Sequence, residues 1–102
     1  MNLIPTPGHG LLAINVFTVR PENQGPLIDA IHAAGDPADV PGLLSMHLLR
    51  SLDGTQVINH MHWSDEEAFR RAVRDDPVIA ATREHVGRLI EGAGPNLYEV
   101  VG

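Results

Sequence analysis

Two asparagines and the only tryptophan of this chain have a spacing that could place them on one surface of a β-sheet. Residues 57–63 form a strand-like run, and side chains alternate between faces along a strand, so Asn59, Met61 and Trp63 share a side. A second strand-like run near the N-terminus carries Asn15. Amide and indole N–H groups can stabilise a developing oxyanion, and an indole offers a flat apolar wall. These residues predict a pocket for a small molecule.

Each of these residues also has a purely structural interpretation. A tryptophan at a strand end can be a core residue, Asn59 can bond a loop backbone, and Asn15 can mark a β-bulge. Arg83 lies beside the apolar stripe of a late helix, where it could hold a phenolate or carboxylate, or lay its stem along the surface. Only their combination favours a pocket.

Hydrophobic periodicity predicts the elements that would position these groups. We expect strands at 11–20, 43–51, 55–63 and 96–101, a helix at 21–34, and two helical segments between the last two strands. Ser64 with Glu67 predicts a capping box for the first of these segments, and Asp76-Pro77 predicts the start of the second. The second carries an apolar stripe that continues to Ile90 and ends at Gly92. This order predicts an α+β fold with a ferredoxin-like βαββαβ unit, a four-stranded antiparallel sheet and helices on one face.

The dipeptide Asp53-Gly54 predicts a tight hairpin, and a two-residue turn would set the register of the strands beside it. His47 would then oppose His60, and Leu48 would oppose Asn59. Leu44, Met46 and Leu48 would join Asn59, Met61 and Trp63 under the helices. Ser45, His47 and Leu49 would join Ile58, His60 and His62 on the other face. That face is too apolar for water and too polar for a dry core, so we expect it to pack on a second copy of the chain.

His47, His60 and His62 allow two interpretations. Their predicted positions could bind zinc or nickel, but no nearby acidic residue completes the shell. A partly hydrated subunit interface tolerates histidines without a metal, and this is the expectation we favour. The dimer should then weaken near pH 6, where histidines gain charge.

Composition excludes several classes of function. The chain has 102 residues, 43% of them hydrophobic, which suffices for one compact domain. A net charge of -6 with only seven Lys and Arg argues against nucleic acid or a membrane as partner. The absence of cysteine excludes disulfides and thiolate chemistry. The N-terminus lacks the features of a signal peptide, so a cytoplasmic protein is expected.

Several short segments resemble the antibiotic biosynthesis monooxygenase domain family. The resemblance rests on the strand order, Val40-Pro41-Gly42, Ser51-Leu52-Asp53-Gly54 and the run Trp63-Ser64-Asp65-Glu66-Glu67-Ala68-Phe69. It implies a dimeric α+β barrel with a pocket between the sheet and the helices of each subunit. The domain would span residues 11–102, after an irregular leader at 1–10.

Within that family the chain resembles the cofactor-free anthrone oxygenases of aromatic polyketide pathways. Asn59 and Trp63 match their Asn-x-x-x-Trp motif, Asn15 matches a first-strand asparagine, and Arg83 matches an arginine of a late helix. Phe69 stands where a tyrosine is expected, so it cannot donate a hydrogen bond. The resemblance implies catalytic roles for Asn15, Asn59 and Trp63. Substrate contacts are expected from Arg83, Phe69, Met61 and Phe17.

The implied function is oxidation of a polycyclic aromatic anthrone or hydroquinone to a quinone in polyketide antibiotic biosynthesis. O2 would be the co-substrate, with no cofactor and no metal. The general base stays open among His85, a substrate phenolate and water. Haem degradation, another activity of the family, is disfavoured because the positions of its tryptophan and histidine hold Ala72 and about Thr82. A polyketide cyclase and a non-catalytic dimer that binds aromatic ligands are the alternatives.

Overall fold

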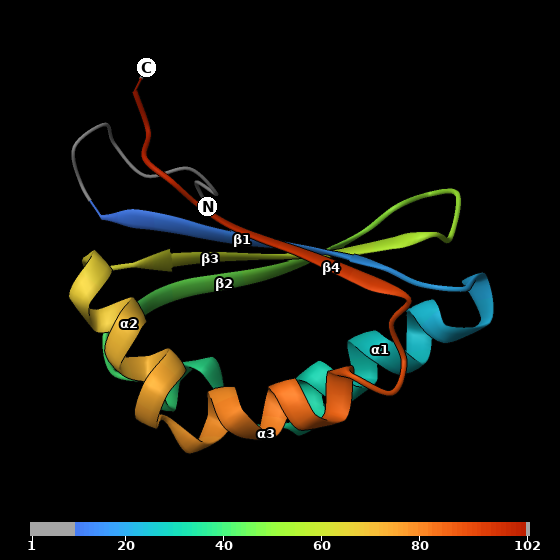
Figure 1. The fold of residues 1–102 in the computed structure, drawn as a ribbon, viewed down its shortest axis with the longest axis horizontal. Coiled ribbons are helices and arrows are strands. Elements are labelled where there is room, and N and C mark those ends of the chain that lie inside the picture. Colours follow the sequence, from blue (N-terminus) through green and yellow to red (C-terminus); the bar gives the residue numbers. More distant parts are fainter. Residues whose placement is uncertain (1–9, 102) are drawn as a thin grey trace.

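A four-stranded antiparallel sheet carries all the described α-helices on one face, in a computed structural model that describes residues 10–101 (Figure 1). The elements in chain order are β1 (Leu11–Thr18), α1 (Pro21–Ala33), the 3-10 turn η1 (Pro37–Asp39), β2 (Leu43–Arg50), β3 (Gln56–Trp63), α2 (Glu66–Asp75), α3 (Pro77–Val86) and β4 (Gly92–Tyr98). The strand order is β2-β3-β1-β4, which confirms the ferredoxin-like α+β prediction. The predicted leader falls almost entirely on residues 1–9, outside the described residues. None of the described helices is long and apolar enough to cross a membrane.

The register of the two central strands places the predicted site residues side by side. In the β1–β3 ladder Asn15 is the direct partner of Asn59, and in the β2–β3 ladder His47 opposes His60 and Leu48 opposes Asn59. The predicted register is therefore confirmed, although the loop from 52 to 55 is longer than a two-residue turn. The loop adds residues symmetrically on both sides, with Ser51 N–H donating to the carbonyl of Gln56 at 3.0 Å, so no strand changes face.

One side-chain assignment on β2 was wrong. A bulge between Leu43 and Ser45 shifts the start of the strand by one residue, so Leu43 opposes Trp63. Leu43 therefore packs under the helices, while Leu44, which was expected there, is 59% exposed.

The last strand starts and ends earlier than predicted, at Gly92 and Tyr98 instead of 96 and 101. Residues 92–95 were expected to lie outside the strand, but they belong to β4, an edge strand that pairs with β1 alone. An edge strand tolerates proline because one row of its backbone groups has no strand partner. The preceding helix is also shorter than its apolar stripe, because α3 ends at Val86.

The helix caps match the sequence at one helix and differ at another. Asp76 caps α3 as predicted, since its carboxylate accepts from the backbone N–H groups of Val78 and Ile79. The cap of α2 is Asp65 and not Ser64, because the Asp65 carboxylate accepts from Ala68 N–H at 2.7 Å. The predicted capping box of Ser64 with Glu67 was therefore wrong by one residue.

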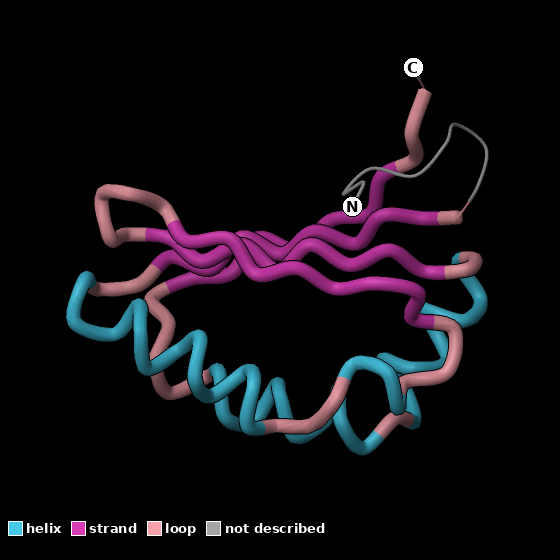
Figure 2. The backbone as a smooth tube through the Cα atoms, turned by 180° about the vertical axis from the view of Figure 1, so that it is seen from behind, coloured by secondary structure: helices cyan, strands magenta, loops and turns pink. Residues whose placement is uncertain are grey.

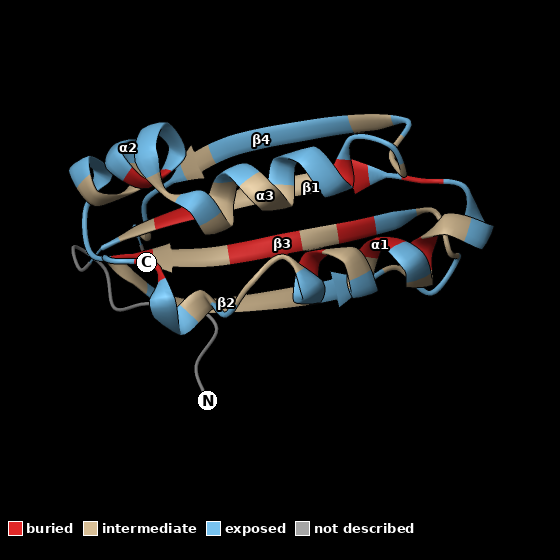
Figure 3. Ribbon diagram, turned by 90° about the horizontal axis from the view of Figure 1, so that it is seen from below, coloured by how far each residue is buried: buried red, intermediate tan, exposed pale blue. Residues whose placement is uncertain are grey.

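The core under the sheet is divided into two clusters. One contains Phe17, Val19, Leu27, Ile31, Val57 and Val86, and the other contains Ala13, Val40, Trp63 and Ala72. Along β1, Asn15 falls between residues of the two clusters, and along β3, Asn59 does the same. The backbone tube in Figure 2 shows the helical layer following the full length of the sheet, and the burial colours of Figure 3 show buried segments along β3. The amide pair therefore lies where the hydrophobic core is interrupted.

Candidate functional site

A pocket of about 660 Å³ lies between the helix-covered face of the sheet and the helical layer. This volume is in the usual range for small-molecule sites. The sheet contributes Ala13, Asn15 and Phe17 of β1, Met46 of β2, Asn59 and Met61 of β3, and Pro95, Asn96 and Leu97 of β4. The helical layer contributes Ile31, Phe69, Val73, Ile79, Thr82, Arg83 and Val86, and the segment before β2 adds Gly35, Pro37 and Val40. Most of these side chains are apolar, so the pocket suits a hydrophobic ligand.

The two amides face each other across the central strands in the floor of this pocket. Directly opposed residues of an antiparallel pair have Cβ atoms about 4.5–5.5 Å apart, and Asn15 and Asn59 are such a pair. Asn59 is only 6% exposed. The side-chain oxygens of both residues are buried and have no hydrogen-bond partner within the described chain. Buried polar groups are normally satisfied, so this pair is an exception to the usual construction of a core.

The side chains of three other polar residues that border the pocket have partners within the protein. The Thr82 hydroxyl donates to the carbonyl of Val78 at 2.8 Å, and the Asn96 side-chain oxygen accepts from Leu97 N–H at 2.9 Å. Arg83 is exposed at the pocket surface and donates to the carbonyl of Val73 at 3.4 Å. This long bond leaves the guanidinium able to turn toward a bound anion.

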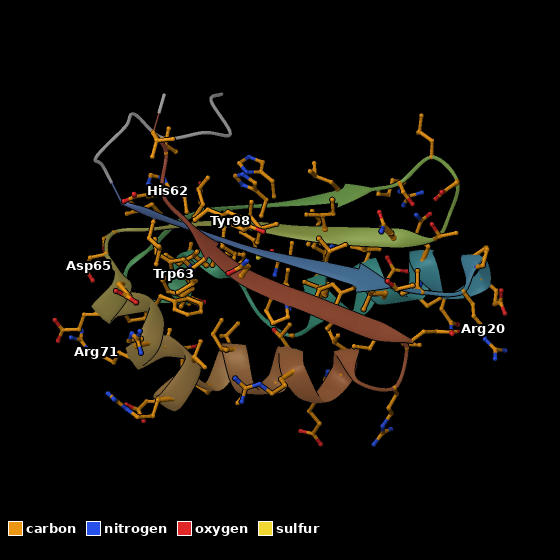
Figure 4. All side chains as sticks on the ribbon, turned by 45° about the horizontal axis from the view of Figure 1, so that its top comes forward. Arg20, His62, Trp63, Asp65, Arg71 and Tyr98 are labelled. Carbon is orange, nitrogen blue, oxygen red and sulfur yellow. The ribbon has the colours of Figure 1, made fainter. Side chains whose placement is uncertain are left out.

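Six of the seven predicted site residues line the pocket, and Trp63 does not. Asn15, Asn59, Arg83, Phe69, Met61 and Phe17 are the residues brought together. Trp63 is completely buried between the end of β3 and α2 (Figure 4), and its ring packs edge-on against Phe69 with centroids 5.6 Å apart. The aromatic surface that the pocket presents at this end is therefore Phe69.

The described lining of the pocket contains no Asp, Glu, His or Lys side chain. His85, a candidate base from the sequence, lies instead in a separate groove with Ala30, Glu84, Arg88 and Leu89. A proton removed from a ligand in the pocket would thus pass to the ligand itself or to water.

The histidines of the other sheet face lie away from this pocket. His47 and His60 have ring centroids 6.5 Å apart, and His62 is on the side of the sheet opposite to Trp63 (Figure 4). Within residues 10–101, no group of three His, Cys, Asp or Glu side chains is arranged to hold a metal ion.

Comparison with known proteins agrees with this architecture. The sequence profile of the family described as antibiotic biosynthesis monooxygenase matches residues 10–84. The chain belongs to this family. No protein with a curated function matches the sequence of this antibiotic biosynthesis monooxygenase domain.

Solved structures similar to this family member include two oxygenases from Streptomyces. A monooxygenase from the gene ActVA-Orf6 of Streptomyces coelicolor, in complex with nanaomycin D, is 31% identical with a TM-score of 0.79. The match covers 92% of this chain and 89% of that one. SnoaB, a cofactor-independent oxygenase from Streptomyces nogalater, is 24% identical with a TM-score of 0.74, over 93% of this chain and 96% of its own. Rv0793 from Mycobacterium tuberculosis is 20% identical with a TM-score of 0.77, over 90% of this chain and 95% of its own.

Several lining residues of this monooxygenase-family pocket were not among the residues predicted from the sequence. Pro95, Asn96 and Leu97 of β4 were missed because Gly92 and Pro95 suggested a break. Met46 had a usable signal, since the predicted register places it on the same face as Asn59. Pro37 follows α1 and offered no chemical signal.

Proposed function

We propose that this protein is a cofactor-independent monooxygenase that oxidises a polycyclic aromatic anthrone or hydroquinone to a quinone with O2. The observation that carries the proposal is the apolar pocket with two opposed, incompletely satisfied amides in its floor. The likeness to the ActVA-Orf6 monooxygenase, whose complex contains nanaomycin D, supports an aromatic ligand and a role in polyketide antibiotic biosynthesis. The description of SnoaB as cofactor-independent supports chemistry without a bound cofactor.

The reaction balances without a cofactor when the substrate itself supplies the electrons. An anthrone loses a proton from its methylene carbon, and the delocalised carbanion gives one electron to O2. The radical and superoxide combine to form a C–O bond. The O–O bond of the resulting peroxide then breaks as the second methylene hydrogen leaves as a proton. One oxygen atom stays as the quinone carbonyl, and the other leaves as water.

Asn15 and Asn59 are proposed to stabilise the oxygen that becomes negative during deprotonation and peroxide formation. Both carbonyl oxygens are buried, so the polar group left to meet a ligand is the N–H2 end of each amide. Two donors held on neighbouring strands need little reorganisation in a site poor in water. One such donor lowers the barrier by roughly 3 kcal/mol.

The remaining lining residues are proposed to bind the ring system. Phe17, Met61 and Phe69 supply apolar surface, and exposed Arg83 holds a phenolate or carboxylate near the pocket surface. With no acidic or basic side chain in the described lining except Arg83, the substrate's own phenolate or a water molecule takes the methylene proton.

The protein is further proposed to act as a homodimer through the sheet face without helices. Leu49 is 40% exposed on the same side of the sheet as the buried His60, and Leu44 in the bulge is 59% exposed. An apolar face of this kind is typical of an interface. We also propose that residues 11–102 form a single domain, which is the unit that pairs in the dimer.

An absorbance assay tests the proposed function. Metal-stripped protein is mixed with a simple anthrone in air and under argon, and quinone formation is followed. We expect acceleration in air, none under argon, and a large loss in Asn59→Ala. Acceleration of a different, O2-independent reaction would favour a cyclase, and ligand binding without turnover would favour a non-catalytic protein.

A further inference from the structure

Trp63 is completely buried and does not line the pocket, although it lies next to a residue that does. Its indole packs edge-on against the Phe69 ring, with an interplanar angle of 77° and centroids 5.6 Å apart. Phe69 in turn lines the pocket. The ring contact makes Phe69 a direct link between the indole and the pocket.

The indole is fully buried in one of the two core clusters. Ala13, Val40 and Ala72 are buried in the same cluster. Directly after Trp63, the Ser64 N–H donates to the carbonyl of Gly42 at 2.8 Å, which fixes the end of β3. The Asp65 carboxylate then caps α2, so the helix that carries Phe69 starts from a fixed point.

The approach of α2 to the segment before β2 is too close for larger side chains. Gly42 has φ of +84°, and a Cβ at this position would lie 2.5 Å from the Cβ of Ala68. Ala68 and Ala72 are small, so the helix can settle directly onto the indole. This close approach restricts the position of α2, the helix that carries Phe69.

We propose that Trp63 is a positioning residue, which fixes the Phe69 ring as the wall against which the flat aromatic ligand packs. The inference rests on the proposed function only for the class of ligand. A ring held in one orientation before binding loses less conformational entropy when the ligand arrives. Phe69 offers no hydrogen-bonding group, so it contacts the apolar part of the ring system and leaves the oxygens to the amides and Arg83.

A double-mutant cycle on ligand affinity tests this inference. The probe is anthraquinone sulfonate, an oxidised ring system whose Kd can be measured by calorimetry without turnover. Trp63→Phe keeps a ring but breaks the observed packing, and we expect it to weaken binding about three- to tenfold. In a Phe69→Leu background the same substitution should have almost no effect, because the residue it acts through is gone.

Phe17→Leu is the matched control, because Phe17 lines the pocket from the other core cluster. In that background the effect of Trp63→Phe should keep its full size. Thermal melting of every variant separates lost affinity from lost fold. If Trp63→Phe does not melt cooperatively, Trp63→Tyr takes its place in the cycle.

The inference is overturned if Trp63→Phe weakens binding equally with and without Phe69, or does not weaken it. It is also overturned if the wild-type protein does not bind the quinone. Turnover of an anthrone is measured in parallel. If the Trp63 and Phe69 substitutions are coupled in binding but the protein does not turn over the anthrone, only the proposed function is wrong. If the protein turns over the anthrone but the two substitutions act independently, only this inference is wrong.

Discussion

Replacing Asn59 with leucine should make the protein more stable and much less active. Asn59 is 6% exposed, and its side-chain oxygen is buried without a partner in the described part of the chain. An unsatisfied buried acceptor costs about 1–3 kcal/mol of folding free energy. Leucine has a similar size and no polar atom, so Asn59→Leu should recover this amount. For a domain of this length the Tm should rise by about 5 °C or more.

The same substitution removes a proposed donor to the developing oxyanion. Loss of one such donor should lower kcat about a hundredfold or more. Thermal melting and the anthrone assay measure the two effects on one preparation. Asn96→Leu is the matched control for stability, because the Asn96 oxygen already accepts from Leu97 N–H and the residue is exposed. It should not raise the Tm.

A lower Tm in Asn59→Leu would refute the reasoning about the orphan oxygen. Undiminished turnover would refute the proposed role of the amide. A parallel rise in stability and loss of activity would identify a residue kept for function at a cost in stability.

Three further outcomes are expected. Hydrogen bonds from Thr55 and Ser51 lower the pKa of Asp53 from 3.8 to about 2. The ionised carboxylate therefore stabilises the fold at pH values above its ordinary pKa, and this stabilisation should be lost as the pH falls toward 2. Asp53→Asn should abolish that part of the acid dependence in thermal melts, and fully exposed Leu52→Ala should leave it intact. His85→Ala should leave the pH–rate profile unchanged, because His85 lies outside the pocket. A shifted profile would indicate that His85 is the general base. Leu49→Asp on the open sheet face should shift sedimentation from dimer to monomer, whereas a wild-type protein that sediments as a monomer would contradict the interface.

The sheet could be predicted from the sequence because its signals are local. Alternation along β3 assigned Asn59, Met61 and Trp63 to one face, and Asp53-Gly54 set the β2–β3 register that the structure confirms. Capping chemistry located the start of α3 at Pro77. These patterns depend on neighbours along the chain, which a single sequence contains.

The errors arose where tertiary contacts decide the outcome. Pairing with β1 keeps Pro95 in a strand despite its local preference for a break. The bulge near Leu43 depends on how the chain meets the end of β3, and no local pattern marks it. Periodicity gave Trp63 the correct face, but only packing with α2 shows that Phe69 stands between the indole and the pocket. The apolar pattern of a helix likewise predicts which face is buried, but it does not predict the volume of the pocket between that face and the sheet.

Isotope labelling tests the central claim most directly. Metal-stripped protein oxidises an anthrone under ¹⁸O2 in ordinary water, and the mass of the quinone is measured at early times. We expect one heavy oxygen atom in each newly formed quinone carbonyl, at a rate above that of the protein-free reaction. A quinone without heavy oxygen, or a rate equal to the protein-free reaction, would contradict the assignment as a cofactor-independent monooxygenase.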